Sequence, residues 1–147
     1  MATWITSPFE SNESANIVMG TVKSDVTHFR SNPRFIYRID ISWPYAPDAK
    51  GMPDEATSQL MEQVQEALET TFAKDPVAVL TGVYTGEGAR DLVFYTLSLH
   101  IFQRKLNEAL APFPMLPLTF SAEEDPDWEE YTRMYEAVKA ADTLSDD

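Results

Sequence analysis

The residues that could carry out chemistry are few and lie far apart in the chain. An imidazole titrates near neutral pH, so His100 could act as an acid, a base or a ligand. Tyr95 lies close to it in the sequence, Arg38 and Asp40 alternate along an earlier segment, and Trp43 follows them. A small enzyme or ligand binder would therefore have a site spread across loops near Trp43, Tyr95 and His100. A partly exposed helix position is the simpler interpretation of His100, and we assign no catalytic residue.

A dense run of carboxylates lies near the end of the chain. Residues 107–147 hold eleven acidic and two basic residues, in a chain whose formal net charge is −13. The run lacks the alternating ligands and central glycine of a calcium loop, so we expect no metal site. We expect Asp125 to be the N-cap of a helix. Acidic side chains in the first turn of a helix interact favourably with its dipole. The other five carboxylates, here called the acidic segment, form a candidate interaction surface: Glu123, Glu124, Asp127, Glu129 and Glu130.

The charge distribution is compatible with two interpretations. A one-sided acidic surface attracts a basic partner, most plausibly a protein, and the same charge could serve solubility alone. Direct binding of nucleic acid is not expected, because phosphate backbones require clustered lysine and arginine.

The absence of several motifs excludes some classes of binding site and catalytic mechanism. The chain has no cysteine, which excludes disulfides, thiolate metal sites and a cysteine nucleophile. Gly86 and Gly88 fall in a hairpin loop rather than at a helix start, so they do not form a phosphate loop. The sequence also lacks a nucleophile elbow of the type Gly-x-Ser-x-Gly. We therefore expect no cofactor.

A chain of 147 residues is the usual size of one domain. We expect a single α+β domain over residues 1–138 and a frayed acidic tail over residues 139–147. No apolar run approaches the roughly 20 residues that cross a bilayer, and residues 1–14 do not resemble a signal peptide. We therefore expect a cytoplasmic protein with no membrane partner.

The clearest predicted element is a strand over residues 34–43. Its side chains alternate in character, and the apolar set should face the core: Phe35, Tyr37, Ile39, Ile41 and Trp43. Arg38 and Asp40 then lie on the opposite face. RNA-binding sheets of this kind place aromatic side chains on the open face, so the arrangement argues against an RNA platform.

The order of the remaining elements predicts a ferredoxin-like (split βαβ) α+β fold. Helical periodicity and capping residues predict three helices. One has Pro53 in its first position, one begins at Leu99, and one has Asp125 as its N-cap with Pro126 in its first position. Strands are predicted at residues 17–23, 77–84, 91–97 and 117–122. We expect both main helices on one face of an antiparallel sheet, with an extra N-terminal strand and a C-terminal helix. The N-terminal strand either extends a sheet edge or pairs with residues 34–43.

A sheet with its helices on one side leaves its other face open. We expect either a homodimer, formed through a sheet edge or through that face, or coverage by the C-terminal helix. That helix carries an apolar stripe that could serve this purpose: Trp128, Tyr131, Tyr135 and Val138.

Several segments together resemble a known family. They are residues 34–45 ending in Trp43-Pro44-Tyr45, the helix start Gly51-Met52-Pro53, and residues 88–95 and 125–131. In order and spacing these segments are similar to the uncharacterised bacterial domain-of-unknown-function family 695, over about residues 34–136. The resemblance implies an α+β fold and a bacterial origin. Some family members are joined to a domain similar to the regulator of ribonuclease E, which implies a regulatory setting, and the family defines no catalytic residue.

We therefore expect a non-catalytic regulatory or protein-binding module that acts through the acidic segment. The alternative is the small enzyme or ligand binder with a site near Trp43, Tyr95 and His100.

Overall fold

The chain folds around one antiparallel sheet. The computed structural model describes residues 4–10 and 17–145. The strand order is β1-β2-β4-β5-β3-β6, and each neighbouring pair is antiparallel. The strands are β1 (Trp4–Glu10), β2 (Ile17–Lys23), β3 (Tyr37–Pro44), β4 (Ala78–Gly86), β5 (Ala89–Thr96) and β6 (Thr119–Glu124). The helices are α1 (Thr27–Arg30), α2 (Glu55–Lys74), α3 (Leu99–Leu110) and α4 (Glu129–Ser145).

The predicted α+β class is confirmed, and the sheet is larger than predicted. Within the described residues it has six strands, because the segment before the predicted N-terminal strand contributes β1. Strands β3 and β5 lie inside the sheet. The strand predicted at residues 17–23 is β2, which pairs with β1 and β4. Of the two positions left open for it, the structure shows the one beyond β4 and not the one beside β3.

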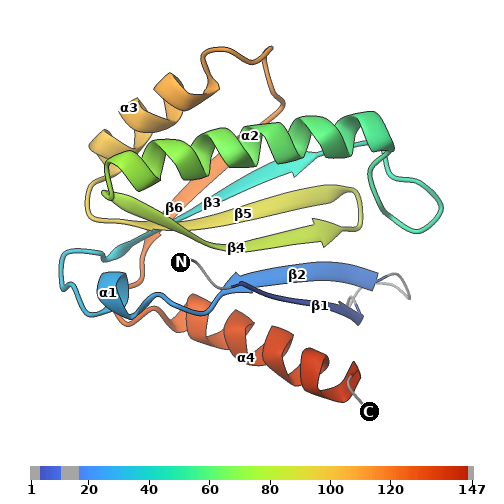
Figure 1. The fold of residues 1–147 in the computed structure, drawn as a ribbon, viewed down its shortest axis with the longest axis horizontal. Helices are drawn as coiled ribbons and strands as arrows, with labels where there is room; N and C mark the ends of the chain where they lie inside the picture. The colour runs from blue at the N-terminus through green and yellow to red at the C-terminus, as the bar shows by residue number, and fades with distance from the viewer. Residues whose placement is uncertain (1–3, 11–16, 146–147) are drawn as a thin grey trace.

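Helices α2 and α3 cover one face of the sheet (Figure 1). The alternation of β3 directs Ile39, Ile41 and Trp43 into the core between this face and the two helices, where all three are buried. Phe72 of α2 stacks on Phe102 of α3, with ring centroids 5.3 Å apart. The main core therefore joins the two helices to each other as well as to the sheet.

Helix α4 covers the opposite face, where it packs on β1, β2 and β4 (Figure 1). A second buried cluster lies beneath its first turns: Val26, Phe35, Val79, Val93, Tyr95, Trp128 and Tyr131. The prediction that Phe35 faces α2 and α3 is wrong, because β3 begins only at Tyr37 and Phe35 packs in this second cluster. Tyr37 itself is half-buried and belongs to neither cluster. Since α4 covers much of this face, the predicted open face is not available in full for a dimer.

The main helices begin with side-chain caps. The carboxylate of Asp54 accepts a hydrogen bond from the N–H of Thr57 at 2.7 Å, so α2 begins after Asp54 and not at Pro53 as predicted. Ser98 accepts a hydrogen bond from the N–H of Ile101 at 3.2 Å and caps α3 in the same way. No helix in the described part of the chain is long and apolar enough to span a membrane.

Helix α4 begins later and ends later than predicted. It starts at Glu129, because Pro126 and the next residue form a turn and Trp128 has a left-handed φ of 55°. It continues to Ser145 and so includes most of residues 139–147, for which the sequence predicts a frayed tail. The last two residues of that tail, 146 and 147, lie outside the described residues.

Trp128 should be essential for stability. Its side chain is 1% exposed, its ring stacks on Tyr95 at 4.0 Å between centroids, and its indole N–H donates to the carbonyl of Phe35 at 2.8 Å. Truncation of such a side chain costs about 3–5 kcal/mol. We expect Trp128→Ala to lower the free energy of unfolding by that amount, measured by chemical denaturation. Met115→Ala is the control, because Met115 is 99% exposed; equal stability of Trp128→Ala and wild type would show that α4 is not docked.

Candidate functional site

Three of the predicted site residues meet on the α4 side of the sheet. Arg38 of β3 lies opposite Tyr95 of β5, and Asp40 lies two residues farther along the same face. Trp43 belongs to the core under α2 and α3, so it lies on the opposite side of the sheet. His100 is exposed on α3. The structure therefore brings Arg38, Asp40 and Tyr95 together, and it separates them from Trp43 and His100.

Arg38 is surrounded by carboxylates. Its guanidinium lies 3.1 Å from Asp40, 3.1 Å from Glu123 and 3.7 Å from Asp125. Burial by itself would lower the pKa of Arg38, but the charges of Asp40 and Glu123 outweigh that effect and raise it. Burial raises the pKa of Asp40, and Arg38 offsets this only in part. An anionic ligand would have to displace these carboxylates from Arg38. The cluster is therefore better suited to holding β3 and β6 together than to binding a ligand.

Asp125 was predicted only as a helix cap, and it proves to be the centre of this cluster. The hydroxyl of Tyr95 donates to its carboxylate at 2.6 Å, and the N–H groups of Glu129 and Glu130 donate to it at 2.9 Å and 3.1 Å. Burial by itself would raise the pKa of Asp125, but these donors together with Arg38 lower it below its ordinary value. Asp125 is thus held as a buried carboxylate that joins β3, β5 and α4.

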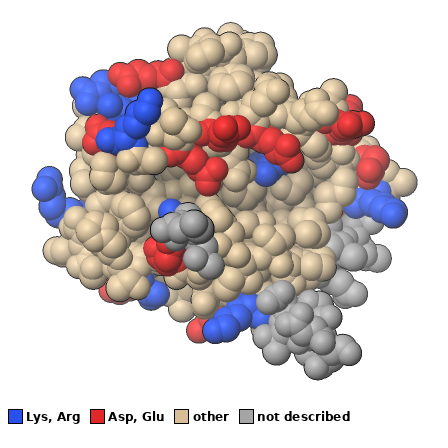
Figure 2. Space-filling view, in the orientation of Figure 1, with Lys and Arg blue, Asp and Glu red and all other residues tan. Residues whose placement is uncertain are grey.

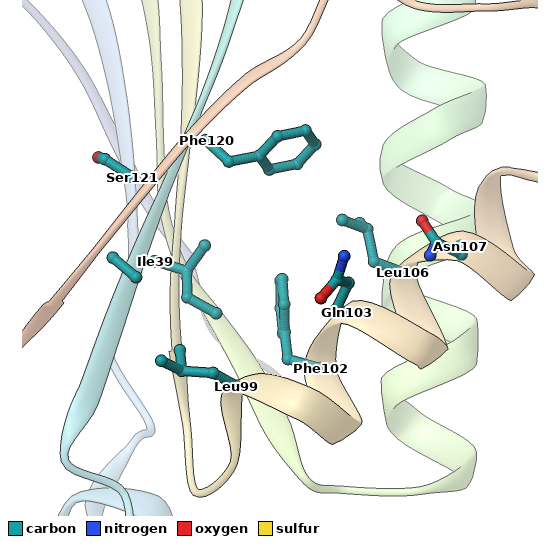
Figure 3. Close-up of a pocket in the computed structure, with 9 residues that line it drawn as sticks. Ile39, Leu99, Phe102, Gln103, Leu106, Asn107, Phe120 and Ser121 are labelled. Atoms are coloured by element: carbon teal, nitrogen blue, oxygen red, sulfur yellow. The ribbon is translucent and has the colours of Figure 1, made fainter.

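An apolar hollow that sequence reasoning missed lies between β6 and α3. Figure 3 shows Phe120 of β6 and Phe102 and Leu106 of α3 extending into the same space. The hollow has a volume of about 330 Å³, and polar Gln103 and Asn107 also line it. Phe120 is 54% exposed even though it faces this space. Alternation along β6 could have identified the face of Phe120, but the distance between β6 and α3 has no sequence signal.

A second hollow continues this surface along the loop before β6. It has a volume of about 420 Å³ and shares Asn107 and Phe120 with the first hollow. Met115 lines it and is 99% exposed. Exposed apolar side chains that gather in one place mark protein contacts more often than scattered ones do. We name this region the β6 surface. Its exposed residues are Leu99, Met115, Phe120 and Ala122, and the buried side chains of Phe102 and Leu106 line the hollow beneath them.

The acidic segment is divided between β6 and the start of α4. Glu123 and Glu124 lie in β6, while Glu129 and Glu130 lie in the first turn of α4. Glu123 pairs with Arg38 and Glu130 pairs with Arg133. The other members are exposed and form no ion pair with another described residue: Glu124, Asp127 and Glu129.

Exposed acidity is not confined to the C-terminal third of the chain. Figure 2 shows a band of acidic side chains across the face on which α2 lies, and α2 exposes Glu55, Glu62 and Glu66. The charge alone therefore does not distinguish the acidic segment from α2. What distinguishes Glu123 and Glu124 is that they follow Phe120 and Ala122 of the β6 surface in the same strand. Among the described residues, no group of three or more histidine, aspartate or glutamate side chains is arranged to hold a metal ion.

The hydrogen bond from Tyr95 to Asp125 should make stability depend on pH. A carboxylate with a lowered pKa stabilises the fold above its ordinary pKa of about 3.9, and this contribution is lost as the pH falls through the folded-state pKa. Tyr95→Phe removes one donor to a charged group, which typically contributes about 1.5–3 kcal/mol. We expect this loss at pH 7 and a smaller difference from wild type below about pH 4.

Chemical denaturation from pH 7 to pH 2 measures this difference. Tyr135→Phe is the matched control, because the Tyr135 hydroxyl forms no hydrogen bond with another described residue. If the stability difference between Tyr95→Phe and wild type stays constant with pH, Tyr95 does not act through the ionised form of Asp125.

Comparison with known proteins places the chain in a family. A search of curated proteins found no match. A family model described as a family of unknown function, DUF695, matches residues 9–135, which is most of the chain. The match includes β3, the hairpin of β4 and β5, the β6 surface and the first turns of α4. The chain therefore belongs to the DUF695 family of unknown function.

Proposed function

We propose that this protein is a non-catalytic binding module that regulates a basic protein partner by contact. One observation carries the proposal: β6 is the outermost strand on its side of the sheet, each of its residues is exposed, and it borders the apolar hollow of about 330 Å³. A monomeric surface with no partner seldom combines a free strand edge with clustered apolar side chains. The exposed carboxylates of Glu123 and Glu124 in the same strand, followed along the chain by those of Asp127 and Glu129, favour a basic partner.

The fold explains why β6 is available. We propose that β3 to β6 with α2 and α3 form a ferredoxin-like core, because the order β4-β5-β3-β6 places β5 between the two strands that α2 connects. The hairpin of β1 and β2 extends this core on the β4 side. Because the added strands lie beside β4, β6 remains the outermost strand at the opposite edge of the described sheet. A cytoplasmic location is part of the same proposal.

The enzyme or ligand-binder alternative has less support. It required Trp43, Tyr95 and His100 to contribute to one site. Trp43 and Tyr95 lie in the two cores on opposite sides of the sheet, and His100 lies on the exposed side of α3. A site that used Arg38 would have to compete with the carboxylates that already surround it.

Capture of partners from the native lysate tests the proposal. The test variant is Glu124→Gln, Asp127→Asn and Glu129→Gln together, since these carboxylates have no ion pair to lose within the described part of the chain. We expect capture at low salt to weaken about fivefold, because each exposed ion pair contributes modestly, and to weaken for wild type as salt increases.

The matched control changes the same amount of charge on α2, at Glu55→Gln, Glu62→Gln and Glu66→Gln. The proposal requires that this control capture partners as wild type does. If both variants lose capture equally, or neither does, the acidic segment has no specific role in binding.

A further inference from the structure

The outer edge of β6 presents backbone groups without partners in the sheet. The N–H of Asp125 donates to the carbonyl of Ile36 at 2.7 Å. Hydrogen-bonded pairs alternate with non-hydrogen-bonded pairs along an antiparallel ladder, so every second residue before Asp125 also directs its N–H and C=O toward β3. These inward residues are Thr119, Ser121 and Glu123. The residues that direct their N–H and C=O outward, where the described sheet has no further strand, are Phe120, Ala122 and Glu124.

The same alternation separates the side chains of β6 onto two faces. Phe120 and Ala122 lie opposite two residues of the main core, Ile41 and Ile39, so their side chains face the hollow beside α3. Glu123 lies opposite Arg38 and faces the α4 side. A strand added to β6 would therefore offer one set of alternate side chains to the apolar hollow and the other set to the α4 side, where Glu123 pairs with Arg38 and remains 67% exposed.

We infer that the basic partner binds by adding a β-strand to β6, with apolar side chains in the hollow beside Phe120 and lysine or arginine side chains on the side of Glu123. The inference rests on the proposed function and specifies its mode of contact. Charge complementarity supports the choice of occupant. Strand β6 has two carboxylates and no basic residue, and Asp127 and Glu129 follow it with exposed carboxylates.

A second copy of the chain fits the edge less well. Each copy carries a formal net charge of −13, and pairing two β6 strands would bring two acidic segments together. Like charges at short distance oppose association, most strongly at low salt. Binding of a basic strand would instead be strongest at low salt, because its positive charges are attracted to the same carboxylates.

A synthetic peptide tests the inference directly. The probe is an eight-residue peptide that alternates valine and lysine, added to the full chain and followed by NMR of the backbone amides. We expect shifts at the amides of Phe120, Ala122 and Glu124. N-methylation of the valines should abolish binding, because the residues opposite those three positions exchange hydrogen bonds with β6. N-methylation of the lysines should leave binding unchanged, since their amides face away from β6.

A protein variant gives an independent test. Ala122→Pro removes one outward N–H and leaves the ladder with β3 intact, which is the position where edge strands tolerate proline. We expect it to weaken peptide affinity about tenfold, the effect of one or two lost hydrogen bonds. Thr70→Ala, at an exposed position of α2 away from β6, is the control and should bind as wild type does.

The remaining outcomes overturn the inference in distinguishable ways. No binding of the peptide, unchanged affinity in Ala122→Pro, or equal effects of the two methylated peptides would show that the partner does not add a strand. In that case the proposed function would stand if capture from the lysate still depended on the acidic segment. If capture did not depend on the acidic segment, both the inference and the proposed function would fail. Self-association of the free chain with protected β6 amides would identify a second copy as the occupant and exclude the basic strand.

Discussion

The buried carboxylate of Asp125 constrains the C-terminal third of the chain. A carboxylate that leaves water needs donors, and no single element supplies enough of them. Asp125 takes them from Tyr95 on β5 and from the first turn of α4, with Arg38 of β3 nearby. The chain must therefore turn directly after β6, and α4 must begin beneath β5. Its apolar stripe then covers the second face of the sheet on the way to β1 and β2.

This constraint divides the acidic residues into two groups with different physical roles. Glu123 and Asp125 are near Arg38 and contribute to the internal order of the sheet. Glu124, Asp127 and Glu129 lie in the same short stretch of chain but face solvent. Within one run of carboxylates, Asp125 thus caps α4, while Glu124, Asp127 and Glu129 form an exposed acidic surface. This surface is available to another molecule, and Glu123 remains accessible beside it because its side chain is 67% exposed even though it pairs with Arg38.

Sequence reasoning identified the elements whose periodicity is set by one dominant contact. Alternation in residues 34–43 identified an interior strand because Ile39, Ile41 and Trp43 all face one core. The stripe of Trp128 and Tyr131 identified a docked helix for the same reason. Phe35 was misplaced because the alternation begins before the strand does, in a segment where the backbone is not extended into the ladder. Strand β1 and the hollow beside Phe120 depend on packing between segments distant in sequence, which a local pattern does not encode.

The exposed edge of β6 also affects how the protein behaves in concentrated solution. Free strand edges are templates for aggregation, and proteins commonly guard them with charged side chains. The charged side chains of β6 are the carboxylates Glu123 and Glu124, so they protect the edge only when they are ionised. Near the isoelectric point of about 4.4, the net repulsion between molecules disappears while the edge and its apolar neighbours remain. We therefore expect molecules of this protein to associate edge to edge more readily near the isoelectric point than at neutral pH.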